Sequence, residues 1–143
     1  MTSLRDIGLS QGLVDHLAAD DQSGPFGYRC QPAHYWKSSP IAERDIVALW
    51  ESGTVLNYFD QARRRFEQCS LEDIDAPWHS FTSLQGALAV LFITGYEDEL
   101  SDEVLRDYAR SFDFRHIERM LAEVPQAPEA YEHWRQTFPV SCA

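Results

Sequence analysis

The sequence predicts an α+β fold in a single domain spanning residues 1–143: an antiparallel β-meander covered by helices, with a helical C-terminal third. Apolar residues recur at helical spacing near the start of the chain and through its last third, whereas β-branched and aromatic runs separated by turn signals fill residues 45–71. A chain of 143 residues that is 44% hydrophobic can bury a core without disulfides. No linker or shift in composition suggests a domain boundary.

The first forty residues are predicted to form one short helix and then a loop. Gly8 and Gly12 delay or break the helix, whose apolar residues are Leu4, Ile7, Leu9, Leu13, Val14 and Leu17. Residues 22–40 are rich in glycine and proline, and they have room for one short strand. The aromatic side chains of this loop must pack on the core or bind something; they are Phe26, Tyr28, Tyr35 and Trp36.

Three strands are predicted next, at residues 45–50, 54–60 and 65–71, because these runs are apolar, β-branched or aromatic. Residues 51–53 form the first turn and residues 61–64 the second, which gives a three-stranded antiparallel meander. The only basic run, Arg63-Arg64-Arg65, falls at the second turn. It is expected to be a solvated hairpin tip paired with Glu67 or Asp60.

Helices are predicted for the rest of the chain. The longest covers residues 80–97, with Ser80 as its N-cap, and should lie over the sheet. Ser101 and Asp113 are expected to cap a second and a third helix. Pro125 and Pro128 then end one helix and start the last, at residues 129–138.

Charge is distributed unevenly along the chain. The formal net charge is -11, and residues 66–105 contain nine acidic residues and no Lys or Arg, whereas both ends are nearly neutral. This segment should repel phosphate backbones and anionic membranes and attract a basic protein. We therefore expect a protein partner and no nucleic-acid or membrane partner.

Neither a targeting segment nor a membrane span is expected. The start of the chain lacks the basic and long apolar segments of a signal peptide, and its longest apolar run is too short to cross a bilayer. The three cysteines, Cys30, Cys69 and Cys142, are odd in number and widely spaced, which favours reduced thiols in a cytoplasmic protein.

No catalytic, metal or cofactor motif stands out, so we expect a non-catalytic protein without metal or cofactor. One alternative is a small hydrolase or transferase that uses Cys30 with His34, or Cys69 with His79. Another is a regulatory scaffold that forms a homo-oligomer through the aromatics of residues 26–36. Glu129 and His133 lie one helical turn apart but have no third ligand nearby, so a solvated helix face is the better interpretation.

The candidate partner-binding residues flank the longest predicted helix. A loop tryptophan beside acidic residues can anchor an interface, and acidic side chains accelerate the capture of a basic partner. The candidates are Glu72, Asp73, Asp75 and Trp78 before the helix, and Glu97, Asp98 and Glu99 after it.

Five short stretches together resemble the SUKH superfamily, especially its shorter bacterial immunity-type members. The resemblance covers residues 3–100 and lies in the opening segment, the first hairpin and the stretch that leads into the longest helix. The five stretches are residues 3–9, 46–50, 52–58, 69–72 and 80–84. The resemblance implies an α+β binding module without catalysis, which neutralises a bacterial toxin, often a nuclease, by covering its active site.

Overall fold

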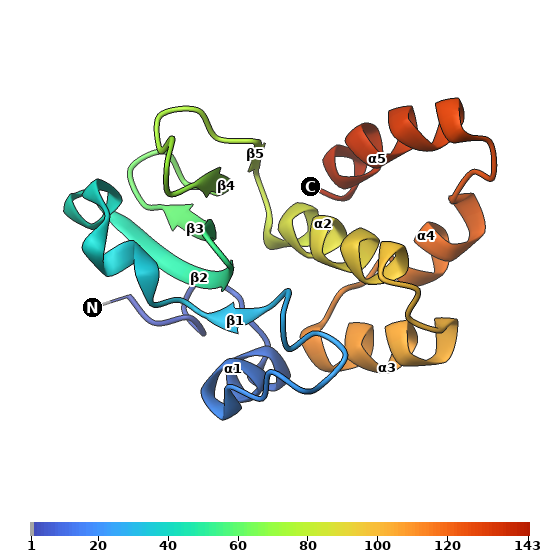
Figure 1. The fold of residues 1–143 in the computed structure, drawn as a ribbon, viewed down its shortest axis with the longest axis horizontal. Coiled ribbons are helices and arrows are strands. Elements are labelled where there is room, and N and C mark those ends of the chain that lie inside the picture. The colour runs from blue at the N-terminus through green and yellow to red at the C-terminus, as the bar shows by residue number, and fades with distance from the viewer. Residues whose placement is uncertain (1) are drawn as a thin grey trace.

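The computed structural model describes residues 2–143 and shows the α+β architecture that the sequence predicts, with a helical C-terminal portion (Figure 1). The sheet contains β1 (Gln31–Pro32), β2 (Ile46–Ser52), β3 (Val55–Asp60), β4 (Arg65–Ser70) and β5 (His79–Phe81). The α-helices are α1 (Gln11–Ala19), α2 (Leu84–Glu97), α3 (Asp102–Phe112), α4 (Ile117–Glu123) and α5 (Pro128–Cys142). Two short 3-10 helices, η1 (Tyr35–Ser38) and η2 (Pro40–Glu43), lie between β1 and β2.

The sheet is an antiparallel meander in the order β1-β2-β3-β4-β5. Its three central strands confirm the predicted meander, and the short edge strands β1 and β5 extend it. The first turn was predicted at residues 51–53, but Glu51 and Ser52 belong to β2. The turn itself begins at Gly53, whose φ of 60° is a backbone conformation that favours glycine.

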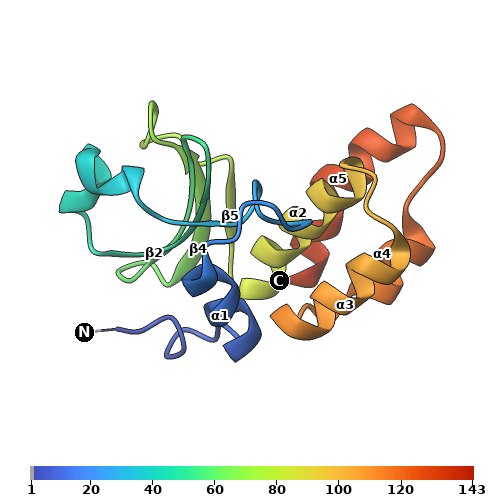
Figure 2. The ribbon, with the colours of Figure 1, turned by 60° about the horizontal axis from the view of Figure 1, so that its bottom comes forward.

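Side chains of the sheet alternate between two packed faces. One face carries Leu49, Phe59 and Phe66, which join the helices in the main core. The other face carries Tyr58 and Cys69, which form a smaller cluster with residues that include Ile41 and Leu56. Figure 2 shows α2 to α5 on one side of the sheet and the cyan segment that contains η1 and η2 on the other.

The helix that follows the sheet begins later than predicted. Ser80 lies within β5 and pairs with Glu67, so it is not an N-cap. Ser83 takes that role, and its hydroxyl accepts a hydrogen bond from the Gln85 N–H at 3.2 Å. The helix was predicted to start too early because Phe81 matches the helical spacing of the apolar residues that follow it. In the structure Phe81 is a buried residue of β5.

The last three helices confirm part of the prediction and correct the rest. Ser101 caps α3 by accepting a hydrogen bond from the Val104 N–H at 3.2 Å, as expected. Asp113 was expected to begin the next helix, but it ends α3 with a left-handed φ of 59°. Helix α5 starts at Pro128 and continues beyond the predicted end, through Pro139 to Cys142. A proline in the last turn removes only one helical hydrogen bond, and the buried side chains around it keep the turn in place.

Candidate functional site

A cleft of about 430 Å³ opens between the helix-facing side of the sheet and helices α2 and α5. Its floor comes from the strands, one wall from α2, and the opposite rim from the loop before β5. The lining residues that carry polar or aromatic groups are Arg29, Trp50, Ser52, Asn57, Gln68, Trp78, His79, Thr94, Glu97 and Arg135. The cleft therefore offers hydrogen-bonding side chains and one exposed indole ring, that of Trp78, to a ligand or partner.

The floor of the cleft is a pair of amide side chains on neighbouring strands. Asn57 on β3 and Gln68 on β4 lie opposite each other in the sheet. The Gln68 Nε2 donates to the Asn57 Oδ1 at 3.1 Å, and Asn57, which is 4% exposed, also lies 3.5 Å from the Trp50 carbonyl oxygen. This contact fixes the orientation of both amides, because each interior polar group needs a partner.

Trp78 and His79 form the rim at the start of β5. The Trp78 N–H donates to the Gln68 carbonyl at 2.7 Å, which ties the loop to β4, while the indole ring is 58% exposed. His79 stacks on Phe81 with ring centroids 5.6 Å apart. Burial, and after it the charge of Arg135, lowers the pKa of His79 below its ordinary value, which favours the neutral ring.

Two ion pairs lie at the C-terminal end of α2. Glu97 at the end of α2 accepts hydrogen bonds from Arg135 at 2.7 Å and from the Tyr131 hydroxyl at 2.7 Å. Burial would raise the pKa of Glu97, but the hydrogen bonds from these two side chains outweigh it and lower the pKa. Asp98 receives two hydrogen bonds from Arg29 at 2.9 and 3.1 Å. The cleft is thus close to neutral although the chain is strongly acidic.

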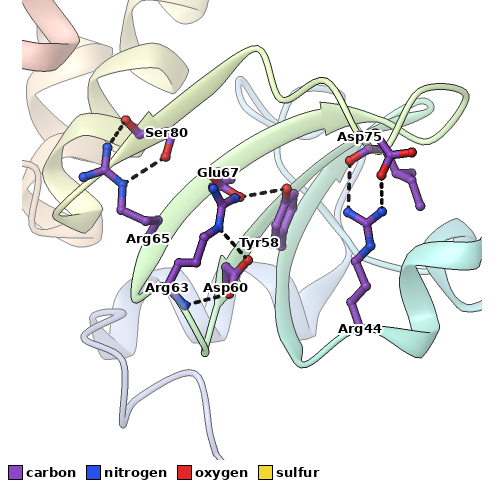
Figure 3. Close-up of polar contacts among 9 residues, drawn as sticks. Arg44, Tyr58, Asp60, Arg63, Arg65, Glu67, Asp75 and Ser80 are labelled. Carbon is purple, nitrogen blue, oxygen red and sulfur yellow. Dashed lines mark hydrogen bonds and ion pairs between the residues drawn. The ribbon is translucent and has the colours of Figure 1, made fainter.

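The seven candidate residues fall into two groups once their contacts are known. Asp75, Glu97 and Asp98 are ion-paired, with Arg44, Arg135 and Arg29 respectively. Glu72, Asp73 and Glu99 are exposed, and among the ion pairs of residues 2–143 none includes them. The structure brings Trp78 and Glu97 to one cleft, whereas Asp75 is held by Arg44 (Figure 3).

Both cysteines of the alternative Cys–His pairs are buried. Cys30 is buried, its backbone carbonyl contacts the ring of His16 at 3.1 Å, and burial raises the pKa of its thiol. Cys69 faces the smaller cluster, whereas His79 lines the cleft on the other face of the sheet. Burial raises the pKa of Cys69 to about 11, so its thiolate is scarce at neutral pH.

Sequence patterns missed two buried carboxylates on the smaller-cluster face. Glu51 was placed in a turn, but it is 1% exposed and accepts hydrogen bonds from the N–H groups at the start of η1, at 3.0 Å from Tyr35 and 3.0 Å from Trp36. Glu67 is 3% exposed and accepts hydrogen bonds from Arg63 and from the Tyr58 hydroxyl (Figure 3). Residues two positions apart share a strand face, so the available signal for Glu67 was Cys69 on the same face, and no such pattern indicated Glu51.

The residues of the basic run do not share one environment, and neither do those of the aromatic loop. Arg63 pairs with Asp60 and Glu67 as predicted, whereas Arg65 donates hydrogen bonds to Ser80 across the strands. In the aromatic loop Phe26 is fully buried in the main core, but Tyr28 and Tyr35 are 62% and 63% exposed.

The described part of the chain, residues 2–143, contains no cluster of three or more potential metal ligands among its His, Cys, Asp and Glu side chains. Within the same residues, no helix has the length and apolar character needed to cross a membrane. Comparison of the chain with models of protein families, with curated proteins and with solved structures finds no match.

Proposed function

We propose that the protein is a non-catalytic binding domain of the immunity type, and that it neutralises a basic toxin domain by binding it at the cleft and the acidic segments beside it. The observation that supports this best is the meeting of Trp78 and Glu97 in one cleft, although Trp78 precedes β5 and Glu97 is the last residue of α2. The resemblance to immunity-type SUKH proteins supplies the class of function.

The exposed indole of Trp78 suits an anchor for a partner. It has a large apolar surface at the rim of a concave site, and its backbone is held by Gln68, so little ordering is needed on binding. The fixed amides of Asn57 and Gln68 below it can exchange hydrogen bonds with a loop of the partner. Removing the indole should therefore weaken the complex strongly.

The acidic residues without ion pairs favour a basic partner. Glu72 and Asp73 lie in the loop that leads to Trp78, and Glu99 follows α2. Their charges are not neutralised by ion pairs, so they can attract a basic protein to the segments that carry them. Toxins that act on nucleic acid tend to be basic, which fits the same proposal.

The proposal is tested by capture followed by a growth assay. Tagged protein should retain a basic protein from lysate of its source at low salt, and retain less of it at moderate salt. That protein should stop growth when expressed alone, and co-expression of the wild-type chain should restore growth. Trp78→Ala should lower retention and rescue, whereas Tyr35→Ala, which removes an equally exposed aromatic ring elsewhere, should leave both unchanged.

Two outcomes would contradict this function. One is a retained protein that has no effect on growth, and the other is equal loss of rescue in the Trp78→Ala and Tyr35→Ala variants.

A further inference from the structure

Strand β2 has an open edge beside β1. The two residues of β1 pair only with Trp50 and Glu51, so within residues 2–143 residues 46–48 have a strand partner on the β3 side alone, and Leu49, at a β-bulge, is paired with no residue of β3. All four are apolar, and Ile46, Val47 and Ala48 are only half-buried. An apolar strand edge of this kind is a template for another strand.

The ladder shows which backbone groups are available at this edge. The Gln61 N–H donates to the Asp45 carbonyl at 3.0 Å, and the same register pairs Val47 with Phe59 and Ala48 with Tyr58. Hydrogen-bonded and non-hydrogen-bonded pairs alternate in an antiparallel ladder, so Val47 bonds toward β3 and Ala48 turns its N–H and C=O toward the open edge.

The open edge lies in a groove of about 810 Å³. On one side the groove is lined by Leu4 and Leu17, which pack on the main core. On the other side it is lined by Ala33 and Trp36, which pack on the smaller cluster. Side chains therefore border the strand edge on both sides. The space between them suits one extended chain better than the edge of a second folded sheet, which is bulkier.

The charge of the groove indicates which charged group a bound segment would carry. Lys37 is the only charged residue in the lining, and it is the only lysine of a chain with a net charge of -11. No ion pair within residues 2–143 includes Lys37. A carboxylate in the groove would meet a cation here without an acidic neighbour in the lining.

We propose that this groove binds an extended segment of a partner protein, which adds to the sheet as a strand alongside residues 46–49. The segment carries apolar side chains toward both walls and one carboxylate for Lys37. This surface is distinct from the cleft between the sheet and α2, so the inference goes beyond the proposed function and does not depend on it.

The test uses a library of random peptides displayed on phage and selected on the wild-type protein. Enriched peptides should share alternating apolar residues and an Asp or Glu. Ala48→Pro removes the outward N–H, and proline is tolerated at a strand edge where the N–H faces solvent, so the variant should fold and bind these peptides at least about tenfold more weakly. Ala48→Gly retains the N–H and should bind them as the wild type does, with circular dichroism as the check on folding.

A second variant tests the charge independently of the backbone. Lys37→Glu should weaken the acidic peptides several-fold and leave matched peptides with Gln in place of the acidic residue unaffected. The double variant Glu72→Lys/Asp73→Lys, which alters the other surface, should not change peptide binding.

Three results would overturn the inference. The first is that no peptide is enriched on the wild type, and the second is that selected peptides bind Ala48→Pro and Ala48→Gly equally. The third is sedimentation of the wild type as a dimer that Ala48→Pro converts to a monomer, because the groove would then hold a second copy of this chain.

Discussion

Two buried carboxylates on one face of the sheet are compensated in different ways. Glu67 faces a cation, Arg63, whereas Glu51 faces the N–H groups that open η1. Backbone N–H groups at the start of a helix have no acceptor within the helix, and the carboxylate of Glu51 supplies one. It thereby ties β2 to the segment that carries Trp36 and Lys37.

Glu51→Ala is expected to destabilise the protein by about 2–3 kcal/mol, because it leaves several buried N–H groups without an acceptor. Urea unfolding followed by circular dichroism measures the free energy of unfolding. Glu43→Ala, which removes an exposed carboxylate from η2, is the control and should stay close to the wild type. Equal midpoints for the two variants would show that Glu51 does not hold η1.

Glu97 predicts a pH dependence of stability. Its pKa is lowered in the folded protein by Arg135 and Tyr131 against the opposing effect of burial, so its contribution is present above the ordinary value of 4.5 and is lost as the pH falls through the lower folded value. The difference in unfolding free energy between the wild type and Glu97→Gln should therefore shrink from pH 7 toward pH 3. In an Arg135→Met background the change should be smaller. A difference that stays constant over this range would contradict the assignment.

The sequence selected acidic residues and one tryptophan that flank the longest helix as candidates for binding, but it did not indicate the partners of these residues. Asp98 and Arg29 are 69 positions apart, and Glu97 and Arg135 are 38 apart. Local periodicity contains no information about such pairs, because the fold alone brings them together. For the same reason the cleft itself could not be predicted, although Trp78 and Glu97 were both selected.

At the scale of elements, close packing of α2 on β5 depends on a glycine. A Cβ atom at Gly86 would lie 2.5 Å from the Phe81 ring, which is buried at the end of β5. The contact explains why a helix interior contains a residue that lowers helix propensity. The contact between Gly86 and Phe81 also fixes the position of β5, whose first residue follows Trp78.

Gly86→Ala is expected to destabilise the protein by about 1–3 kcal/mol, although the same change in a solvated helix would stabilise it. Thermal or urea unfolding would measure the effect. In a Phe81→Leu background the cost should be smaller because the ring is absent. A stabilised Gly86→Ala variant would mean that α2 does not press on β5.

Element types were predictable from periodicity, whereas several boundaries were not. The central strands and the Ser101 cap follow from local alternation and hydrogen bonding, and both are confirmed. The backward extension to Ser80 and the role of Asp113 were wrong, since helical spacing continues across residues that tertiary pairing places in a strand or a left-handed turn. The short strands β1 and β5 are defined by their neighbours and leave little pattern of their own.

At the scale of the whole molecule, charge and shape divide the surface into two regions. The cleft beside α2 is lined by Arg29, Arg135 and Glu97, and the loop that leads to its rim carries Glu72 and Asp73, whereas the groove beside β2 is lined by one lysine and no acidic residue. The two regions can therefore favour partners of different chemistry on one small domain. The excess of acidic residues in residues 66–105 was visible in the sequence, whereas the cleft was not.

The most direct measurement is the association rate of the purified chain with the captured basic partner, followed by stopped-flow fluorescence over a range of salt concentrations. Glu72→Lys/Asp73→Lys should slow association at low salt by about tenfold and flatten its salt dependence. Asp107→Lys/Glu123→Lys makes the same change in net charge on α3 and α4, and it should leave the rate within about twofold of the wild type. Equal slowing by both double variants, or no slowing by either, would contradict the claim that the residues beside Trp78 form the binding surface.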